Sequence, residues 1–332
     1  MANIKDVAKK AGVSVTTVSR VFNNRGYISQ ETRDKVLKAM EEIDYQPNQL
    51  ARALQQKQSY ILGVIVPDSN HPFFSDLIKY MEMFASEHDF KILLCNSLGN
   101  AEKEEKYISM LRQNRVDGII MCSHTLEVAE YKKANMPIVS FDRVLSNNLP
   151  YVGSDNYGGG EMATKHLIDR GCKSLLHISG PVEFDSLSNR RGDAFILTCM
   201  RYGVSYKVQE GTLNHLTFDY FWDFINKEVA PNLHEFDGVF CSNDIVAYAL
   251  YIYATQKGVK VPGELQIVGY DYHSFTKMLQ NPKITTIAQP IERIAKVLIN
   301  TLINLIEEED SETINNAIID VELIQGDTTK HI

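Results

Sequence analysis

The chain has 332 residues, 44% of them hydrophobic and 23% charged, which is an ordinary globular composition and enough length for more than one domain. Its net charge is −8, but residues 1–60 contain ten Lys or Arg and six Asp or Glu, so a head of +4 precedes a body of −12. No stretch approaches the roughly 18 apolar residues of a membrane helix and the N-terminus lacks a signal-peptide core, so we expect a cytoplasmic protein with no membrane partner.

The first 45 residues predict three short amphipathic helices. Asn3, Ser14 and Ser29 stand where N-caps are preferred, and Gly12 suits the left-handed turn that ends the first helix. Apolar residues recur at helical spacing on the inner faces, which we expect to hold Ile4, Val7, Ala8, Ala11, Val18, Val21, Phe22, Val36, Leu37, Met40 and Ile43. Because the turn after the first helix is tight, the second must cross it, which predicts a helix-turn-helix.

The second of these helices, Val15 to Asn23, has a polar outer face. Thr16, Ser19 and Arg20 point away from the first helix. Hydroxyls bond base edges or phosphates, and arginine grips guanine through two hydrogen bonds. Together with the basic head, this favours double-stranded DNA as a partner. Spacing alone leaves open a small helical bundle with a solvated face.

From Tyr60 the pattern changes to alternating strands and helices. Buried strands are predicted at 61–67, 91–96, 117–122, 137–141, 174–178, 204–209, 238–241, 266–269 and 285–289. Helices are predicted at 74–88, 101–113, 126–133, 157–170, 189–202, 217–229, 244–257 and 291–308, and residues 317–324 close the chain. This alternation predicts an α/β core of two similar halves with parallel sheets.

The run IKDVAKKAGVSVTTVSRVFN resembles the N-terminus of the lactose/galactose-repressor (LacI/GalR) family of bacterial transcription regulators, which opens with DVA-x-x-AGVS-x-x-TVSRV. The resemblance extends over essentially the full length through VPDSNHPFFSDL, VDGII, SDNYGGGEMATKHLIDRG, FCSNDIVAYAL, LQIVGYD and TTIAQP. LLCNS, CSH and FDR are most similar to the sucrose-operon repressors of Gram-positive bacteria. The resemblance implies a repressor of a carbohydrate-utilisation operon, controlled by a sugar or sugar phosphate, with a sucrose or fructose type favoured.

The family implies three parts for this chain. These are a helix-turn-helix domain at 1–46, a hinge helix at 47–58 and a periplasmic-binding-protein-like effector core at 59–332. Within the core, an N-subdomain takes about 59–158 plus 290–318, and a C-subdomain takes about 159–289 plus 319–332. The family also implies a homodimer on a pseudo-palindromic operator. No leucine-heptad tail follows Gly326, so a dimer is expected rather than a tetramer.

By the resemblance, base reading falls to Val15, Thr16 and Arg20. The wider set of expected DNA contacts is Val15, Thr16, Thr17, Ser19, Arg20, Asn23, Ala51 and Leu54. In the family the hinge helix folds when two subunits meet on DNA. A residue at the position of Leu54 wedges into a minor-groove step there, and Ala51 allows close approach. A frayed linker is the alternative, because so short a helix is marginal alone in water.

Polar side chains beyond the strand ends predict where the effector binds, because ligands of open α/β sheets lie at that edge. The resemblance adds Arg191, although Ala194 replaces the glycine that the family has there, so Arg190 competes for the role. The expected effector contacts are Phe73, Phe74, Ser123, Asp142, Arg191, Asn243 and Asp271. Structural roles are the alternatives for Phe73, as a core residue, and for Asn243 and Asp244, as helix caps.

We expect no catalytic site, no metal site and no cofactor. GGGEMA, beginning at Gly158, fits a dinucleotide fingerprint, but no acidic residue follows at a strand end about 20 residues on, so a nucleotide-dependent enzyme is a weak alternative. The five cysteines are scattered and lack a C-x-x-C pair, which predicts reduced core residues. Within the regulators, the alternative is a global carbon-catabolite regulator that acts with a phosphoprotein corepressor.

Overall fold

The structure is a computed structural model that describes residues 2–22, 26–45, 58–123, 125, 131, 135–180, 186–211, 218–307 and 316–331. The chain divides into two compact units, Met1–Ser59 and Tyr60–Ile332. Asn23, Ala51, Leu54 and most of the helix expected at 126–133 lie outside the described residues. None of the described helices is long and apolar enough to cross a membrane.

The first unit folds as the three predicted helices, α1 (Ile4–Ala11), α2 (Val15–Phe22) and α3 (Gln30–Glu42). Asn3 and Asp6 form a reciprocal capping box, and Gly12 ends α1 at a φ of 66°. The Ser14 hydroxyl then accepts a hydrogen bond from the backbone N–H of Thr17 at 3.0 Å. These local caps set the tight turn that makes α2 cross α1.

The inner face of α3 differs from the prediction at one position. Val7, Val18 and Val36 are buried in the small core of this unit, as predicted. Leu37, however, is 49% exposed, and Ala39 is buried in its place. Ala39 follows Val36 by three residues and so lies on nearly the same face of the helix, whereas Leu37 is rotated from Val36 by about 100°. The prediction for Leu37 was therefore wrong.

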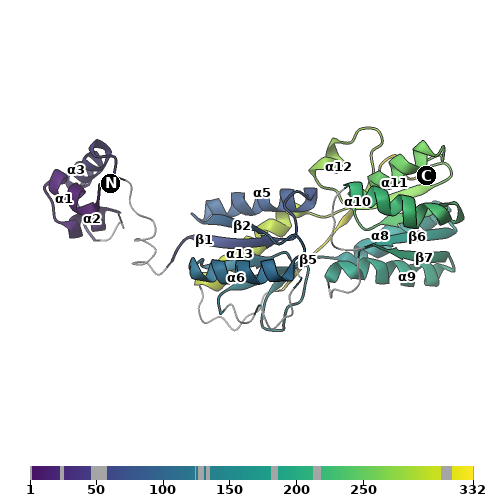
Figure 1. The fold of residues 1–332 in the computed structure, drawn as a ribbon, viewed down its shortest axis with the longest axis horizontal. Helices are drawn as coiled ribbons and strands as arrows, with labels where there is room; N and C mark the ends of the chain where they lie inside the picture. The colour runs from purple at the N-terminus through teal and green to yellow at the C-terminus, as the bar shows by residue number, and fades with distance from the viewer. Residues whose placement is uncertain are drawn as a thin grey trace. The chain divides into compact units, whose positions relative to one another are not determined.

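In the described part of the second unit, the strands form two six-stranded sheets, in the orders β11-β5-β4-β3-β1-β2 and β12-β10-β9-β8-β6-β7 (Figure 1). The first sheet holds β1 (Ile61–Val66), β2 (Lys91–Asn96), β3 (Gly118–Met121), β4 (Ile138–Phe141), β5 (Tyr151–Ser154) and β11 (Ala317–Ile319). The second holds β6 (Ser174–Ser179), β7 (Ser205–Glu210), β8 (Gly238–Cys241), β9 (Gln266–Asp271), β10 (Thr285–Ala288) and β12 (Glu322–Ile324). The described pairings are parallel except β10 with β12. The predicted parallel α/β core is confirmed, with an antiparallel edge strand added.

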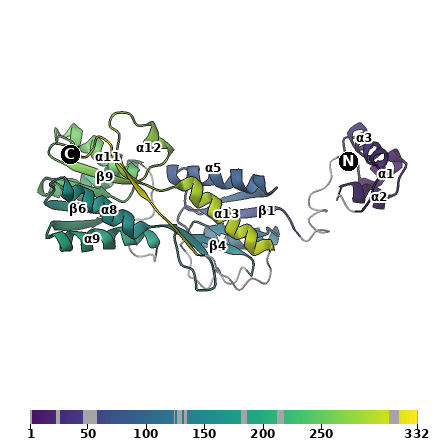
Figure 2. The same cartoon turned by 180° about the vertical axis from the view of Figure 1, so that it is seen from behind.

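Each sheet with its helices forms one half of the core. The first half contains α5 (Pro72–Glu87), α6 (Ala101–Gln113) and α13 (Ile291–Glu307), and the second half contains α8 (Asn156–Asp169), α9 (Arg190–Tyr202), α10 (Phe218–Phe224), α11 (Asp244–Gln256) and the short α12 (Ser274–Met278). The described chain passes between the halves after β5, after β10 and between β11 and β12 (Figure 2). These crossings lie near the subdomain boundaries expected from the sequence, and the exact bounds of the two subdomains stay a prediction.

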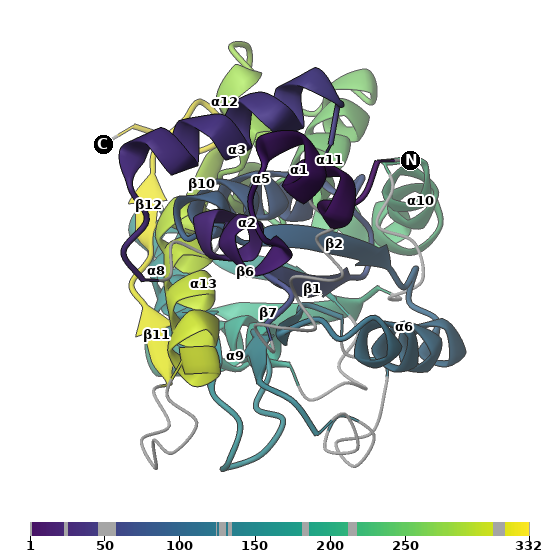
Figure 3. The same ribbon diagram turned by 90° about the vertical axis from the view of Figure 1, so that its left-hand side faces the viewer.

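Helices cover both faces of the first sheet. Figure 3 shows α5 and α6 on opposite sides of β1 and β2. Along β1, Val64 and Val66 pack in the cluster of α5 and α13, whereas Ile65 packs in the cluster of α6. A strand with apolar partners on both faces must be apolar throughout, which is why ILGVIV was recognisable in the sequence.

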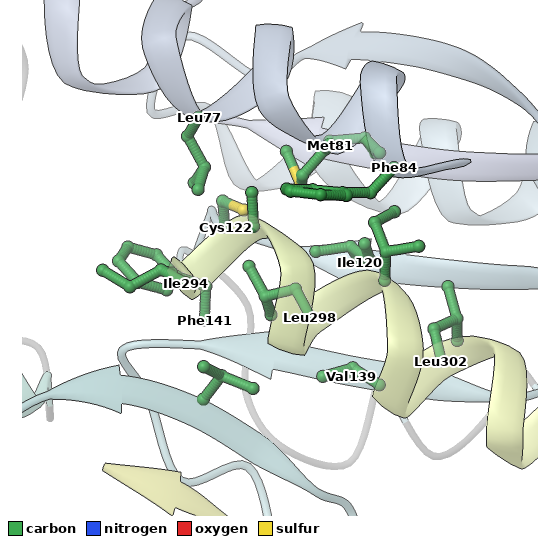
Figure 4. Close-up of a cluster of buried hydrophobic side chains, with 14 of the residues drawn as sticks. Leu77, Met81, Phe84, Ile120, Cys122, Val139, Phe141, Ile294, Leu298 and Leu302 are labelled. Atoms are coloured by element: carbon green, nitrogen blue, oxygen red, sulfur yellow. The ribbon is translucent and has the colours of Figure 1, made fainter. Parts of the chain in front are cut away.

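The helix α13 completes the core of the first half from far along the chain. Ile294, Leu298 and Leu302 recur every four residues and pack toward α5, with Ile120 and Val139 of the sheet in the same cluster (Figure 4). Burying a side chain of this size contributes about 1.5–3 kcal/mol. The packing of α13 therefore anchors the segment that follows β10 to the first half of the core.

Candidate functional site

Polar side chains from both halves meet in a buried hydrogen-bonded network. Asp142, which follows β4, accepts a hydrogen bond on Oδ1 from Nδ2 of Asn156 at 2.7 Å. Arg191 donates from Nε to Oδ1 of Asn156 at 2.7 Å and from Nη1 to the carbonyl oxygen of Ser242 at 2.8 Å. Asp142, Asn156 and Arg191 are all buried, whereas Arg190 is exposed. The predicted residues Asp142 and Arg191 thus meet through Asn156, which the sequence analysis did not name.

A second branch of this network contains Asp271. Gln289 donates from Nε2 to Oδ1 of Asp271 at 2.7 Å and accepts a hydrogen bond on Oε1 from the Ser154 hydroxyl at 2.5 Å. Ser154 ends β5 and Gln289 follows β10, so this branch lies where the chain crosses between the halves. Asp271 has a φ of 111°, which is strained for any residue with a Cβ. Strain of this kind is concentrated at ligand sites and switch regions.

Close packing of α8 positions Arg191. Its guanidinium carbon lies 3.6 Å from the centroid of the Tyr270 ring, in the geometry of a cation–π contact. A Cβ on Gly160 would lie 2.5 Å from the backbone oxygen of Arg191, and a Cβ on Gly159 would lie 2.5 Å from the Tyr270 hydroxyl. These glycines of GGGEMA therefore allow helix packing around Arg191, which accounts for them without a dinucleotide.

Burial shifts the ionisation of three carboxyl groups at this site. Desolvation raises the pKa of Asp142 to about 6, that of Asp244 to about 7 and that of Asp271 to about 8. Arg191 opposes the shift at Asp142 and Asp271, because its positive charge favours their ionised forms. Carboxyl groups in excess over guanidinium suit a polyol, whose hydroxyls donate hydrogen bonds, better than an anion.

Asn243 and Asp244 have separate structural roles. Asn243 is the N-cap of α11, and its Oδ1 accepts from the backbone N–H of Val246 at 3.0 Å. Asp244 accepts from the hydroxyls of Thr276 and Thr286, both at 2.6 Å, and from the N–H of Tyr272 at 2.8 Å. Asp244 therefore holds the loop that follows Asp271, and the cap falls to Asn243. An effector contact through the Nδ2 of Asn243 stays a prediction.

The other three expected effector contacts lie in different surroundings. Phe73 is buried in the core, stacked on Phe141 with centroids 5.6 Å apart. Ser123 is buried, and its hydroxyl lies 2.6 Å from both the Ser97 hydroxyl and Oε2 of Glu104. Phe74 is half-buried, so it keeps more ring surface for a ligand than Phe73 does. Their roles as contacts stay predictions, and the geometry favours Phe74.

The expected DNA-reading side chains lie on α2. Val15, Thr16 and Arg20 are exposed there, as a base-reading role requires. Thr17 and Ser19 are half-buried, and the Thr17 hydroxyl lies 2.9 Å from that of Ser14. The exposed set can therefore reach an outside partner, while Thr17 helps to fix the start of the helix.

Gly160→Ala tests how Arg191 is positioned. The new methyl group would clash with backbone, which cannot move as a flexible side chain does, so we expect a loss of about 1–3 kcal/mol in the free energy of unfolding. Urea unfolding measures this loss. Gly192→Ala is the matched control, because its Cβ would meet only His177 at an ordinary 3.5 Å. Equal stability of the two variants would contradict the positioning role of Gly160.

Two family models match the chain. Residues 3–48 match bacterial regulatory proteins of the lacI family, and residues 59–327 match the periplasmic binding proteins and sugar binding domain of the LacI family. The sucrose operon repressor of Streptococcus mutans is 39% identical over 332 residues, covering 99% of both chains. The ribose operon repressor of Halalkalibacterium halodurans is 37% identical over 338 residues, covering 99% of this chain and 98% of the relative.

A solved structure shares both the fold and a substantial part of the sequence. The periplasmic binding protein/LacI transcriptional regulator from Alkaliphilus metalliredigens, complexed with D-xylulofuranose, is 31% identical, with a TM-score of 0.73. The match covers 82% of this chain and 100% of that one. With the sugar-binding model spanning 59–327 and the regulatory model spanning 3–48, the chain belongs to the LacI family of bacterial transcription regulators.

Proposed function

We propose that this regulator is a homodimeric, cytoplasmic repressor of a carbohydrate-utilisation operon, without enzymatic activity, and that a sugar containing a fructose unit releases it from its operator. The observation that carries the proposal is the buried network of Asp142, Asn156, Arg191, Asp271 and Gln289, which joins the two halves. Such a network of acceptors with one guanidinium suits the hydroxyls of a sugar.

The network supports control through the arrangement of the halves. Asp142 belongs to the first half and Arg191 to the second, while Asn156 and Gln289 lie where the chain crosses. A sugar that adds to these hydrogen bonds, or replaces them, changes the free energy of one arrangement relative to another. To release DNA, it must bind the weakly DNA-binding arrangement more tightly, because equal affinity for both shifts nothing.

The relatives favour a sugar with a furanose ring. D-Xylulofuranose, bound in the regulator from Alkaliphilus metalliredigens, is a ketose in a five-membered ring, as is the fructose unit of sucrose. The 39% identical relative is a sucrose operon repressor, which makes sucrose the first candidate. Ribose is the second candidate, because a ribose operon repressor is 37% identical.

Isothermal titration of the purified full chain tests the effector. We expect binding heat with sucrose or fructose, and the same sugar should release a fluorescently labelled operator. Binding of ribose alone would replace sucrose by the second candidate. Failure of sucrose, fructose and ribose to bind would contradict the proposed effector class.

Exposed apolar side chains support the homodimer. Met83 on α5, Leu94 on β2 and Leu98 just beyond it are exposed, and β2 is an edge strand of its sheet. Burial of such side chains against a second copy favours association. Sedimentation velocity of the full chain measures the state, and a monomer at micromolar concentration would contradict the dimer.

Arg20→Ala tests base reading by α2. We expect a loss of about 1–3 kcal/mol in binding free energy on the cognate operator and a much smaller loss on unrelated DNA, because a bidentate contact to guanine is sequence-specific. Gel shifts on both DNAs measure the two losses. Lys35→Ala is the control, since it removes an exposed positive charge from α3. Equal losses for Arg20→Ala on both DNAs would make Arg20 a phosphate contact.

A further inference from the structure

Two buried histidines, one preceding α5 and one preceding α12, have unsatisfied ring nitrogens. His71 and His273 lie edge to face with ring centroids 6.3 Å apart. Among the described residues, three of their ring nitrogens have no hydrogen-bond partner. These are both ring nitrogens of His71 and Nε2 of His273. Buried polar atoms are nearly always paired, so three such nitrogens in contacting rings indicate a place for an outside group.

The hydrogen-bonding character of these rings follows from their neighbours. Nδ1 of His273 lies 3.2 Å from the Thr276 hydroxyl and 3.4 Å from the Thr276 backbone N–H, so it already has local partners, whereas Nε2 is left for an outside group. Burial lowers the pKa of His71 to about 3 and that of His273 to about 4, so both rings are neutral near pH 7. A neutral imidazole carries one N–H and one bare nitrogen, so His71 offers a donor and an acceptor, and His273 offers Nε2 beside them.

The histidines lie beside the network already described. His273 follows Asp271 by two residues, and Asp244 holds the loop between them. The first half contributes His71, whose ring contacts Phe74 at a centroid distance of 5.8 Å. Oδ2 of Asp76 on α5 accepts a hydrogen bond from the N–H of Ser274 at 2.6 Å, so the two halves touch at this point.

We propose that His71 and His273 form a subsite that binds two neighbouring uncharged hydroxyl groups of the effector, with one imidazole from each half. One hydroxyl lies between Nε2 of His273 and one ring nitrogen of His71, and the second pairs with the other ring nitrogen of His71. Because a hydroxyl both donates and accepts, it matches the N–H and the bare nitrogen of these rings. The subsite rests on the proposed function and narrows it to a sugar that is unphosphorylated at this end.

Other occupants fit the pair less well. A phosphate would set oxygen lone pairs against the bare nitrogen of His71 and negative charge near Asp76, with the exposed Lys277 as the neighbouring cation. Within the described residues, no group of three His, Cys, Asp or Glu side chains fits a metal ion. Neutral imidazoles that both donate and accept are matched by hydroxyl groups, which do the same.

The test follows the imidazole ¹⁵N signals of the full chain by NMR during titration with sucrose, fructose and fructose 6-phosphate. We expect sucrose or fructose to shift the signals of His71 and His273 while both rings stay neutral. In calorimetry, His71→Ala and His273→Ala should each weaken binding of that sugar by about 3–10-fold. His166→Ala is the control, because His166 is also buried but its Nε2 already lies 2.9 Å from the Thr329 hydroxyl.

The outcomes separate the subsite from the function on which it rests. If a sugar binds and neither histidine signal moves, or if fructose 6-phosphate converts either ring to the doubly protonated form, the subsite is wrong and the proposed function stands. If only ribose binds, the histidine signals are followed with ribose. If ribose and these three sugars all fail to bind, the proposed effector class fails and the subsite with it. Should an alanine variant not fold, the signals of the unmodified protein still decide.

Discussion

Asp271→Ala is expected to remain on its operator at sugar concentrations that release the unmodified protein. Asp271 is buried, and with its pKa raised to about 8 its neutral carboxyl group can accept a hydrogen bond from one sugar hydroxyl and donate one to another. Without it, those hydroxyls and Nε2 of Gln289 lose their partner inside the core, and unpaired buried polar groups cost about 1–3 kcal/mol each. The residue lies in the second compact unit, outside the helix-turn-helix, so operator binding itself should persist.

Fluorescence anisotropy of a labelled operator, titrated with sucrose, measures this effect. Asp169→Ala is the control, because Asp169 is a partly exposed carboxylate of the same half that pairs with Lys165 on the surface. Release of the Asp271→Ala protein at an ordinary sucrose concentration would remove Asp271 from the effector contacts.

The ionisation of Asp271 makes the free energy of unfolding depend on pH. Its pKa is raised from 3.8 to about 8 by burial, so the unfolded chain loses this proton well before the folded protein does. The contribution of Asp271 to stability is therefore complete below about pH 4 and falls as the pH rises toward 8. Asp271→Asn keeps an oxygen that accepts from Gln289 but removes the group that titrates. Between pH 5 and pH 8, the free energy of unfolding of the unmodified protein should therefore fall relative to that of the variant. Denaturant unfolding at both values checks this, and a constant difference would contradict it.

The elements with strong local signals could be predicted from the sequence. Asn3, Gly12 and Ser29 mark helix ends through contacts within four residues, and all three behave as predicted. The apolar strands of the core were found because burial on both faces leaves an unbroken hydrophobic run. β5 and α12 were missed because YVGS and SFTKM are too short to show a periodic pattern.

The site was predicted only in part, because its hydrogen bonds join distant segments. Asp142 and Asp271 were recognisable as polar residues just beyond strands. Asn156 and Gln289 stand in the landmarks SDNYGGG and TTIAQP, yet nothing local shows that Asn156 bonds Arg191, 35 residues on, or that Gln289 bonds Ser154, 135 residues back. The same limit applies to Phe73, whose place in the core depends on Phe141. Strand ends can be read from a sequence, whereas the pairing of their side chains requires the fold.

Arg191→Lys is expected to abolish sugar binding even though it keeps the charge. Arg191 uses Nε for Asn156 and Nη1 for the Ser242 carbonyl, while its flat face lies on Tyr270. A lysine ammonium cannot reproduce two divergent N–H bonds from a planar group. Oδ1 of Asn156 and the carbonyl oxygen of Ser242 would then lose their donor, and an acceptor left unpaired inside the protein costs about 1–3 kcal/mol.

Calorimetry with sucrose and denaturant unfolding measure the two consequences of Arg191→Lys. These are a loss of affinity of about 100-fold or more, from two lost hydrogen bonds, and a lower stability of the core. Arg190→Lys is the matched control, because Arg190 is the preceding residue on the same helix but is exposed, and it should leave both quantities unchanged. This pair of variants also decides between the two arginines that the sequence left in competition. If Arg190→Lys lost sugar binding and Arg191→Lys kept it, the ligand would contact the exposed arginine, and the buried network around Arg191 would serve folding alone.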